Sequence, residues 1–95
     1  MEKIRLGIIG IGNMGSEHCR LILSGQTPEI ALTCVADPRQ DRRDWAQQTL
    51  PAGTGIYADG MSLIRAHACD AVLIATPHYQ HPPLAIEAFK NGLHV

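Results

Sequence analysis

Three glycines near the start of the chain surround the end of an apolar run. Gly10, Gly12 and Gly15 form the pattern G-x-G-x-x-G within the stretch GIIGIGNMG, just before a predicted helix. The first glycine of such a loop permits a tight turn, the second leaves room for a pyrophosphate, and the third lets the helix pack on the strand. The helix start at Asn13 and Met14 adds free N–H groups and a partial positive charge. We therefore predict a pyrophosphate site, the alternative being a glycine-rich turn without a ligand.

An acidic residue, Asp37, ends the second apolar run, about 20 residues after this loop. A carboxylate there accepts hydrogen bonds from the hydroxyls of an adenosine ribose and repels a 2′-phosphate, which favours NAD. Arg39, Arg42 and Arg43 follow closely, and a guanidinium could pair with that phosphate. We predict NAD, bound with the help of Asp37 and Arg39, and keep NADP as the alternative. A plain turn and a solvated face of arginines are the structural alternatives.

A short polar segment, ATPHYQH, follows the last long apolar run and contains Thr76, Pro77, His78 and His81. In open α/β sheets, ligands bind at the C-terminal ends of the strands, so this segment is expected beside the cofactor. The histidines could instead form local hydrogen bonds at the start of the next helix. Their spacing could also suggest a metal pair, but no Cys, Asp or Glu lies nearby in sequence to complete it. We predict no metal.

Apolar runs alternate with segments of helical periodicity. The runs are continuous, which is typical of strands buried on both faces of a parallel sheet. The order predicts an α/β fold, a partial Rossmann-type doubly wound parallel sheet with flanking helices, in one domain over residues 1–95. The expected strands are Ile4–Ile9, Ile30–Ala36, Ile56–Tyr57, Ala71–Ala75 and a run from Leu93 to Val95, and the expected helices are Asn13–Ser24, Arg39–Leu50, Met61–His67 and Pro82–Asn91.

Each long helix is expected to bury one face against the sheet. The inward residues predicted for the first helix are Met14, His18, Cys19, Ile22 and Leu23, and those for the last helix are Leu84, Ala85, Ala88 and Phe89.

The composition limits the class of protein. A formal net charge of −1 over 95 residues gives no basic excess, which argues against nucleic-acid binding. No apolar stretch approaches the ~20 residues of a membrane span. Cys19, Cys34 and Cys69 match no zinc or haem spacing. We expect reduced, mostly buried thiols in a cytoplasmic protein without a membrane segment.

Two stretches together resemble one family. The first is GIIGIGNMG with VADP, and the second is DAVLIATPHYQHPPLAIEAFKNGLHV, from Asp70 to Val95. Together they resemble the N-terminal half of the glucose–fructose oxidoreductase and inositol dehydrogenase family (Gfo/Idh/MocA), over essentially the whole chain. In that family a strand ends in Ala-Thr-Pro, and a histidine, a helix with alanines and Gly-x-His-Val follow.

The resemblance implies an NAD(P)-dependent oxidoreductase acting on a sugar, a polyol or a related hydroxyl or carbonyl compound. It implies that Thr76 and Pro77 line the cofactor near its nicotinamide, with His81 close by. The family's Glu-Lys-Pro motif, with the usual catalytic lysine, would follow Val95, and so would a substrate domain. We therefore expect the chain to be the first part of an enzyme of roughly 300–400 residues. We name no catalytic residue and expect no catalysis by these 95 residues alone.

Two other readings of the sequence stay open. The chain could be a non-catalytic module that binds a dinucleotide or associates with itself, because the expected strand at Leu93 to Val95 would offer unpaired N–H and C=O groups. A homo-oligomer is therefore among the expected partners, beside the dinucleotide and a small-molecule substrate in the full-length protein. A domain that binds S-adenosylmethionine also carries a glycine loop and an acidic residue, but the Ala-Thr-Pro and Gly-x-His-Val stretches are unexpected for it.

Overall fold

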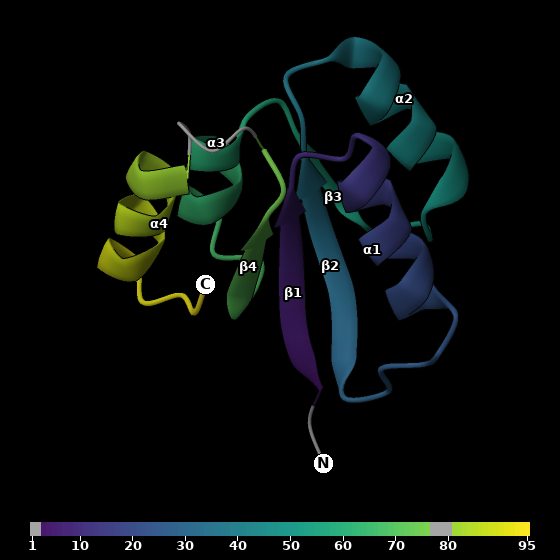
Figure 1. Ribbon diagram of the computed structural model, residues 1–95, viewed down its shortest axis with the longest axis horizontal. Coiled ribbons are helices and arrows are strands. Elements are labelled where there is room, and N and C mark those ends of the chain that lie inside the picture. Colours follow the sequence, from purple (N-terminus) through teal and green to yellow (C-terminus); the bar gives the residue numbers. More distant parts are fainter. Residues whose placement is uncertain (1–2, 77–80) are drawn as a thin grey trace.

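A parallel sheet of four strands forms the centre of the molecule (Figure 1). The computed structural model describes residues 3–76 and 81–95, and for Asn13 and His81 the backbone alone. The strands are β1 (Ile4–Ile9), β2 (Ile30–Ala36), β3 (Gly55–Tyr57) and β4 (Ala71–Ile74), in the order β3-β2-β1-β4. Adjacent strands all pair in parallel. This is the predicted Rossmann-type sheet.

Four helices cover the two faces of the sheet. They are α1 (Asn13–Leu23), α2 (Gln40–Thr49), α3 (Gly60–Arg65) and α4 (His81–Lys90). Figure 1 shows α1 and α2 on one face and α3 and α4 on the other. None of the helices in the described ranges is long and apolar enough to cross a membrane.

The core has two parts because successive side chains of a strand point to opposite faces of the sheet. Ile8 of β1 is fully buried with Cys19 and Ala46, on the side of α1 and α2. The next residue, Ile9, is buried with Leu63 and Leu84, on the side of α3 and α4. Burying each such aliphatic side chain contributes about 1.5–3 kcal/mol, so the continuous apolar runs of the sequence favour a sheet covered on both faces.

The strand order creates a crevice between β1 and β4. The chain leaves β1 toward α1 on one face, and it leaves β4 toward α4 on the other. The two connections therefore diverge at the C-terminal ends of adjacent strands, which is where open α/β sheets bind ligands. This position brings Gly10, after β1, beside Thr76, after β4: a Cβ added to Gly10 would lie 2.9 Å from the Cγ2 of Thr76.

The predicted strand from Leu93 to Val95 is reduced to a single bridge. His94 pairs with Ala71 of β4, and its backbone exchanges hydrogen bonds with Val72 (2.8 Å) and Asp70 (3.1 Å). The other predicted elements are present: Ile4–Ile9 and Ile30–Ala36 have the predicted ends, and the rest differ by at most two residues at either end, which is the usual uncertainty at helix and strand termini.

The buried stripes of α1 and α4 are narrower than predicted. Met14 is 68% exposed because it lies in the first turn of α1, next to the glycine loop at the end of the strand. Leu23, in the last turn, is also exposed. On α4, Leu84 and Ala88 are buried one turn apart, whereas Phe89 is 65% exposed because it lies one position further round the helix.

Candidate functional site

The three loop glycines differ in what a side chain at each position would meet. Gly10 has a φ of +91°, a conformation that side chains disfavour. A Cβ on Gly15 would collide with the carbonyl oxygen of Gly10, so the helix can approach the loop only with glycine there. A Cβ on Gly12 would meet nothing within 4 Å. The positive φ of Gly10 and the close packing at Gly15 therefore explain two of the glycines, whereas Gly12 borders open space.

The start of α1 faces this open space. Gly12 is the N-cap residue and provides no side-chain hydrogen bond to the first turn, and that turn carries no acidic residue. The first backbone bond of the helix runs from the N–H of Ser16 to the carbonyl of Gly12 (2.9 Å). Uncapped N–H groups at a helix start, together with the helix dipole, attract an anion. The local structure suits a phosphate group.

Asp37 is fixed beside the glycine loop. Its Oδ2 accepts a hydrogen bond from the backbone N–H of Ile11 (3.0 Å), and its Oδ1 accepts one from the N–H of Arg39 (2.9 Å). Its side chain is buried, with 8% of the residue exposed. Each carboxylate oxygen has a second lone pair for a further donor. The sequence predicted a ligand-binding carboxylate here, but it gave no sign of the contact with Ile11, which joins two segments distant in sequence.

Two of the three nearby arginines, Arg39 and Arg43, form hydrogen bonds or ion pairs within the protein. The Nη1 of Arg43 donates to the carbonyl oxygens of Asp37 and Pro38, each at 2.9 Å. The guanidinium of Arg39 pairs with Asp41 at 3.0 Å, and both side chains are largely exposed. The Nε of Arg42 is buried and has no hydrogen-bond partner among the described residues. Of the three, Arg39 is the one that lines the cleft at the loop.

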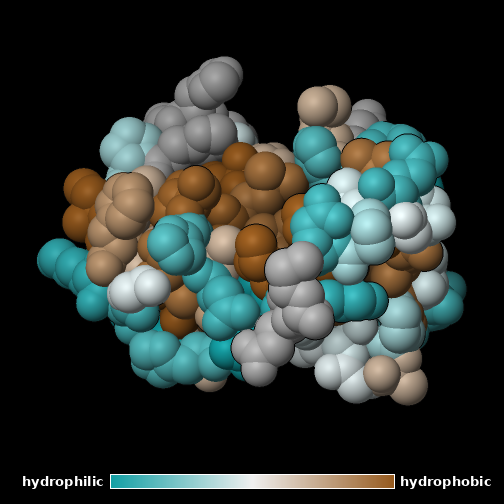
Figure 2. Space-filling view, turned by 90° about the horizontal axis from the view of Figure 1, so that it is seen from below, coloured by the Kyte–Doolittle hydropathy of each residue, from teal (hydrophilic) through white to brown (hydrophobic). Residues whose placement is uncertain are grey.

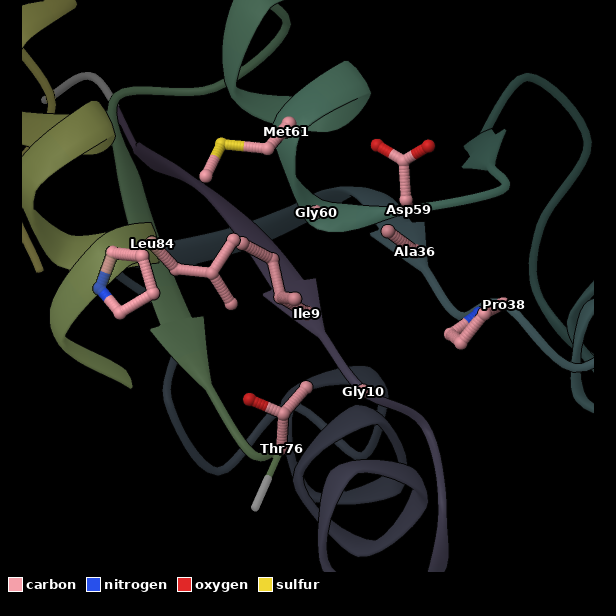
Figure 3. Close-up of a pocket in the computed structure, with 10 residues that line it drawn as sticks. Ile9, Gly10, Ala36, Pro38, Asp59, Gly60, Met61, Thr76 and Leu84 are labelled. Carbon is pink, nitrogen blue, oxygen red and sulfur yellow. The ribbon is translucent and has the colours of Figure 1, made fainter. Parts of the chain in front are cut away.

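Two adjoining hollows open at this end of the sheet. The first, of about 320 Å³, runs along the glycine loop and is lined by Gly10, Gly12, Asp37, Pro38, Arg39, Ala75 and Thr76. The second, of about 260 Å³, lies toward α3 and α4. Its lining is Ile9, Gly10, Ala36, Pro38, Asp59, Gly60, Met61, Thr76, Pro83 and Leu84. Figure 3 shows Ile9, Leu84 and Met61 as apolar walls of this second hollow.

One carboxylate, Asp59, stands at the edge of the second hollow (Figure 3). Its Oδ1 accepts a hydrogen bond from the backbone N–H of Ser62 (2.8 Å), which makes Asp59 the N-cap of α3. This hydrogen bond lowers the pKa of the Asp59 carboxyl below its ordinary value. Asp59 therefore has a structural function that explains its position without a ligand.

Several residues that line the second hollow were not predicted from the sequence as site residues. Pro38, Gly60 and Leu84 belong to segments far apart along the chain. A proline after Asp37 and a glycine before a short helix were visible as turn signals, but only the strand order β3-β2-β1-β4 brings these turns to one place.

The remaining predicted site residues are placed only in part. Thr76 lines both hollows. Pro77 lies outside the described residues, as does His78, and the side chain of His81 does too, although its backbone begins α4. In the ranges that are described, no three His, Cys, Asp or Glu side chains gather where a metal ion could be held.

The fold, the glycine loop and the carboxylate after β2 define a Rossmann domain of the NAD-binding class. A family model described as "Oxidoreductase family, NAD-binding Rossmann fold" matches residues 4–95. The chain belongs to this family, Gfo/Idh/MocA, as its motifs indicated.

Similar proteins agree with this assignment. Inositol 2-dehydrogenase of Rubrobacter xylanophilus is 37% identical over 90 residues, which are 95% of this chain and 25% of that protein. A glycosyl hydrolase family 109 protein of Saccharopolyspora erythraea is 34% identical, covering 99% of this chain and 22% of that protein. The chain thus spans about a quarter of the length of the curated relatives it matches.

Solved structures share the fold. The crystal structure of scyllo-inositol dehydrogenase from Lactobacillus casei, with bound NAD(H) and scyllo-inositol, superposes with a TM-score of 0.88 at 26% identity. The match covers 99% of this chain and 27% of that one. The prediction of an NAD-binding α/β domain is confirmed, whereas these likenesses do not distinguish NAD from NADP.

Proposed function

We propose that this chain binds NAD(H) across the C-terminal ends of β1, β2 and β4, as the dinucleotide-binding domain of a dehydrogenase. One observation carries the proposal: a glycine loop that borders open space at Gly12 lies beside a carboxylate, Asp37, whose position is fixed by the backbone of that loop. The hydrogen bonds from Ile11 and Arg39 hold the carboxylate in place and leave a further lone pair on each oxygen, and a Cβ on Gly12 would meet no atom within 4 Å. Both suit a ligand with a diphosphate and a ribose.

The pyrophosphate would lie over the loop and the start of α1. In this arrangement Gly10, Gly12 and Gly15 give the backbone its shape, and the N–H groups at Asn13 and Met14 face the phosphate oxygens. The uncapped first turn of α1 supports this role. Side chains are not needed for it, which is consistent with the exposure of Met14.

The adenosine would bind where the two hollows adjoin, beside Pro38. The free lone pairs of the Asp37 carboxylate suit the ribose hydroxyls, and the apolar hollow beyond Pro38 suits the flat adenine ring. Arg39 lines the same cleft, where its guanidinium can stack on the adenine or approach the ribose.

We infer a preference for NAD over NADP. A 2′-phosphate would approach the Asp37 carboxylate, whose negative charge repels it. The guanidinium of Arg43 already donates to the carbonyls of Asp37 and Pro38. Arg39 would have to leave Asp41, an exposed ion pair that is weakly held. NADP thus stays a weaker alternative that depends on Arg39.

The nicotinamide end is assigned to the segment after β4. Thr76 lies against Gly10, so a dinucleotide extending from the loop would pass it. Pro77 and His81 follow in the chain and join this proposal through the family motif alone. Bound NAD would accept a hydride, and the likeness to inositol dehydrogenases favours a polyol, sugar or related hydroxyl or carbonyl compound as substrate. The substrate would be bound only in a longer protein, in which residues 1–95 would form part of the dinucleotide-binding domain.

An alternative function is self-association. Ile86 and Phe89 of α4 and Val95 are exposed, and Figure 2 shows apolar residues gathered on the side of the molecule that α4 and the C-terminal residues form. Exposed apolar patches often mark interfaces. A molecular mass that stays monomeric by size-exclusion chromatography as the concentration is raised would contradict this alternative.

Calorimetric titration of the purified chain with NADH, and separately with NADPH, tests the proposal. We expect saturable binding of NADH and binding of NADPH that is weaker by about tenfold or more, equivalent to about 1.4 kcal/mol. The Arg39→Ala variant separates the two cofactors: it should weaken NADPH binding more than NADH binding. A chain that is folded by circular dichroism and binds neither cofactor would overturn the proposal.

The dehydrogenase activity is tested on a longer natural protein that contains this chain. Reduction of NAD at 340 nm is followed with myo-inositol, scyllo-inositol and simple sugars. Activity with one of these polyols or sugars is the expected result. A longer protein that binds NADH but reduces no NAD with any of them would overturn the substrate assignment and leave the binding proposal intact.

A further inference from the structure

Two buried cysteines converge on one glycine of the central strand. A Cβ placed on Gly7 of β1 would lie 2.9 Å from the Sγ of Cys34 and 3.1 Å from the Sγ of Cys69. The two thiols are joined by a side-chain hydrogen bond. Both residues belong to the core beneath α3 and α4, with exposures of 0% and 3%. Neither is used by the cofactor site described above.

An irregularity in the sheet brings the two cysteines together. The pairing of β1 with β2 shifts between Leu6 and Gly7, so that Thr33 is an extra residue in β2. The Oγ1 of Thr33 donates a hydrogen bond to the carbonyl of Ala68, at 2.8 Å. Each cysteine is the next residue after one of these partners. The contact between Thr33 and Ala68 therefore holds Cys34 and Cys69 on the same side of β1, above Gly7.

We propose that Cys34 and Cys69 form an oxidation site, at which a peroxide converts the two thiols into a disulfide that ties β2 to the segment between α3 and β4. The thiolate of Cys69 attacks one oxygen of hydrogen peroxide and breaks the O–O bond, which yields a sulfenic acid and, after protonation, water. The sulfur of Cys34 then attacks the sulfenic sulfur, the S–S bond forms, and a second water leaves with the Cys34 proton. Two thiols are oxidised and one peroxide is reduced to two waters.

The order of these steps follows from the hydrogen bond between the thiols. A bond donated by Cys34 holds the pKa of the Cys69 thiol below its usual range, whereas the same bond and burial raise the pKa of Cys34. Cys69 is thus the first to become the thiolate, which is the nucleophilic form. The third cysteine, Cys19, lies in the other core, where burial raises its pKa to about 11 and keeps it in the unreactive thiol form.

The surroundings leave a route and a space for the reaction. Cys69 closely follows Ala66 and His67, which are exposed, so a local opening of the segment before β4 admits a small peroxide. The sulfurs must approach from hydrogen-bond contact to about 2.05 Å. Gly7 allows this because it places no side chain between them. Reaction at a buried pair that depends on such opening is slower than at an exposed thiol.

The test uses the purified chain in its reduced, folded state. The chain is incubated with excess hydrogen peroxide, quenched, unfolded, counted for free thiols and digested without reductant. The three thiols should fall to one, and the peptides with Cys34 and Cys69 should be linked, with a combined mass two hydrogen atoms below that of the two reduced peptides. Dithiothreitol should restore all three thiols. The oxidised chain should also unfold at a higher temperature, because the bond closes a long loop.

A matched control is the Cys19→Ser variant, which removes the third buried thiol. It should lose both of its thiols to peroxide with the same time course as the unchanged chain. Cys69→Ser should leave Cys34 as a free thiol. Because substitutions in the core can unfold the chain, the decisive result comes from the unchanged sequence. Three thiols surviving in the peroxide-treated chain, sulfinic acid without linked peptides, or a cross-link that involves Cys19 would each overturn the proposal.

Discussion

The side of the crevice formed by β1, α1 and β2 differs in construction from the side formed by α3, β4 and α4. On the first side, backbone meets backbone: Gly15 lies against the carbonyl of Gly10, and the N–H of Ile11 is bound by Asp37. On the second side, the Asp59 side chain caps α3, and α4 leaves Phe89 exposed.

The difference indicates which part of a dinucleotide the chain itself can hold. The contacts of the first side are already formed without a ligand, so we expect binding there to require little ordering, which favours affinity. The second side carries Thr76 and, at its edge, Asp59, and otherwise lines the crevice mainly with apolar side chains. We therefore expect the pyrophosphate and the adenosine ribose to contribute most of the binding to this chain, and substitutions on the first side to have the larger effects.

The largest effect is expected for Gly15→Ala. Its Cβ would collide with the carbonyl oxygen of Gly10, and a backbone contact has no flexible atom that can move aside. We expect a loss of at least about 3 kcal/mol in the free energy of unfolding. Urea denaturation followed by the emission of Trp45 measures it. A loss below about 1 kcal/mol would show that the close approach is not a constraint.

The next effect is expected for Asp37→Asn. The amide can accept only one of the two backbone hydrogen bonds and presents an N–H₂ group to the other donor. A buried, unsatisfied N–H should cost about 1–3 kcal/mol of stability. The affinity for NADH should fall as well, and the preference for NADH over NADPH should decrease.

Asp41→Asn is the matched control for this change. Asp41 is an exposed carboxylate that pairs with Arg39, and its loss should cost less than about 1 kcal/mol. Equal losses of stability at Asp37 and Asp41 would contradict the structural role of Asp37.

Gly12→Ala separates binding from folding. A Cβ there meets no atom within 4 Å, and the residue has a negative φ of −70°, so stability should change by less than about 1 kcal/mol. Affinity for NADH should nevertheless fall by about tenfold or more, because the methyl group occupies the proposed pyrophosphate position. Calorimetry compares the two chains. Unchanged affinity would place the phosphates elsewhere.

On the second side, Asp59→Ala should cost about 0.5–2 kcal/mol at neutral pH, because the N-cap of α3 is lost. The pKa of Asp59 is lowered in the folded state, so its contribution is fully present above the unfolded pKa, near 3.8. The contribution disappears as the pH falls through the lower folded pKa. Thermal unfolding of both chains between pH 7 and pH 2 should show the difference shrinking with acid. A difference in stability between the two chains that grows as the pH falls would contradict the lowered pKa of Asp59.

The smallest effect is a gain. His67 has a φ of +53°, just after α3, where glycine has no steric penalty. His67→Gly should raise the free energy of unfolding by up to about 1 kcal/mol. His94→Gly, at a residue with no such conformation, is a control that should not stabilise. A destabilised His67→Gly chain would mean that the imidazole makes a contact that outweighs the strain.

The local features of the fold could be predicted from the sequence because local chemistry decides them. Continuous apolar runs gave the strands, and the glycine pattern with Asp37 gave the loop side of the site. The faces of α1 and α4 were less predictable. Periodicity marks a broad stripe, but the width that is buried depends on where the helix lies over the sheet, as the exposed Met14 and Phe89 show.

Contacts between distant segments could not be predicted. The hydrogen bond from Ile11 to Asp37, the apolar hollow between Pro38 and Leu84, and the meeting of Cys34 with Cys69 all depend on strand order and on the shift at Gly7. One sequence contains no pairing information of this kind, since each partner alone looks like an ordinary turn or core residue. Pro77 and the side chain of His81 stay predictions.

Amide chemical shifts of the ¹⁵N-labelled chain during titration with NADH test the central claim most directly. The account predicts saturable shifts at Gly10, Gly12, Asp37 and Thr76, which surround the crevice at the C-terminal ends of the strands. Gly25 and Thr27, at the opposite end of the sheet, should not move. Shifts centred on that opposite end, or a folded chain whose spectrum NADH leaves unchanged, would contradict it.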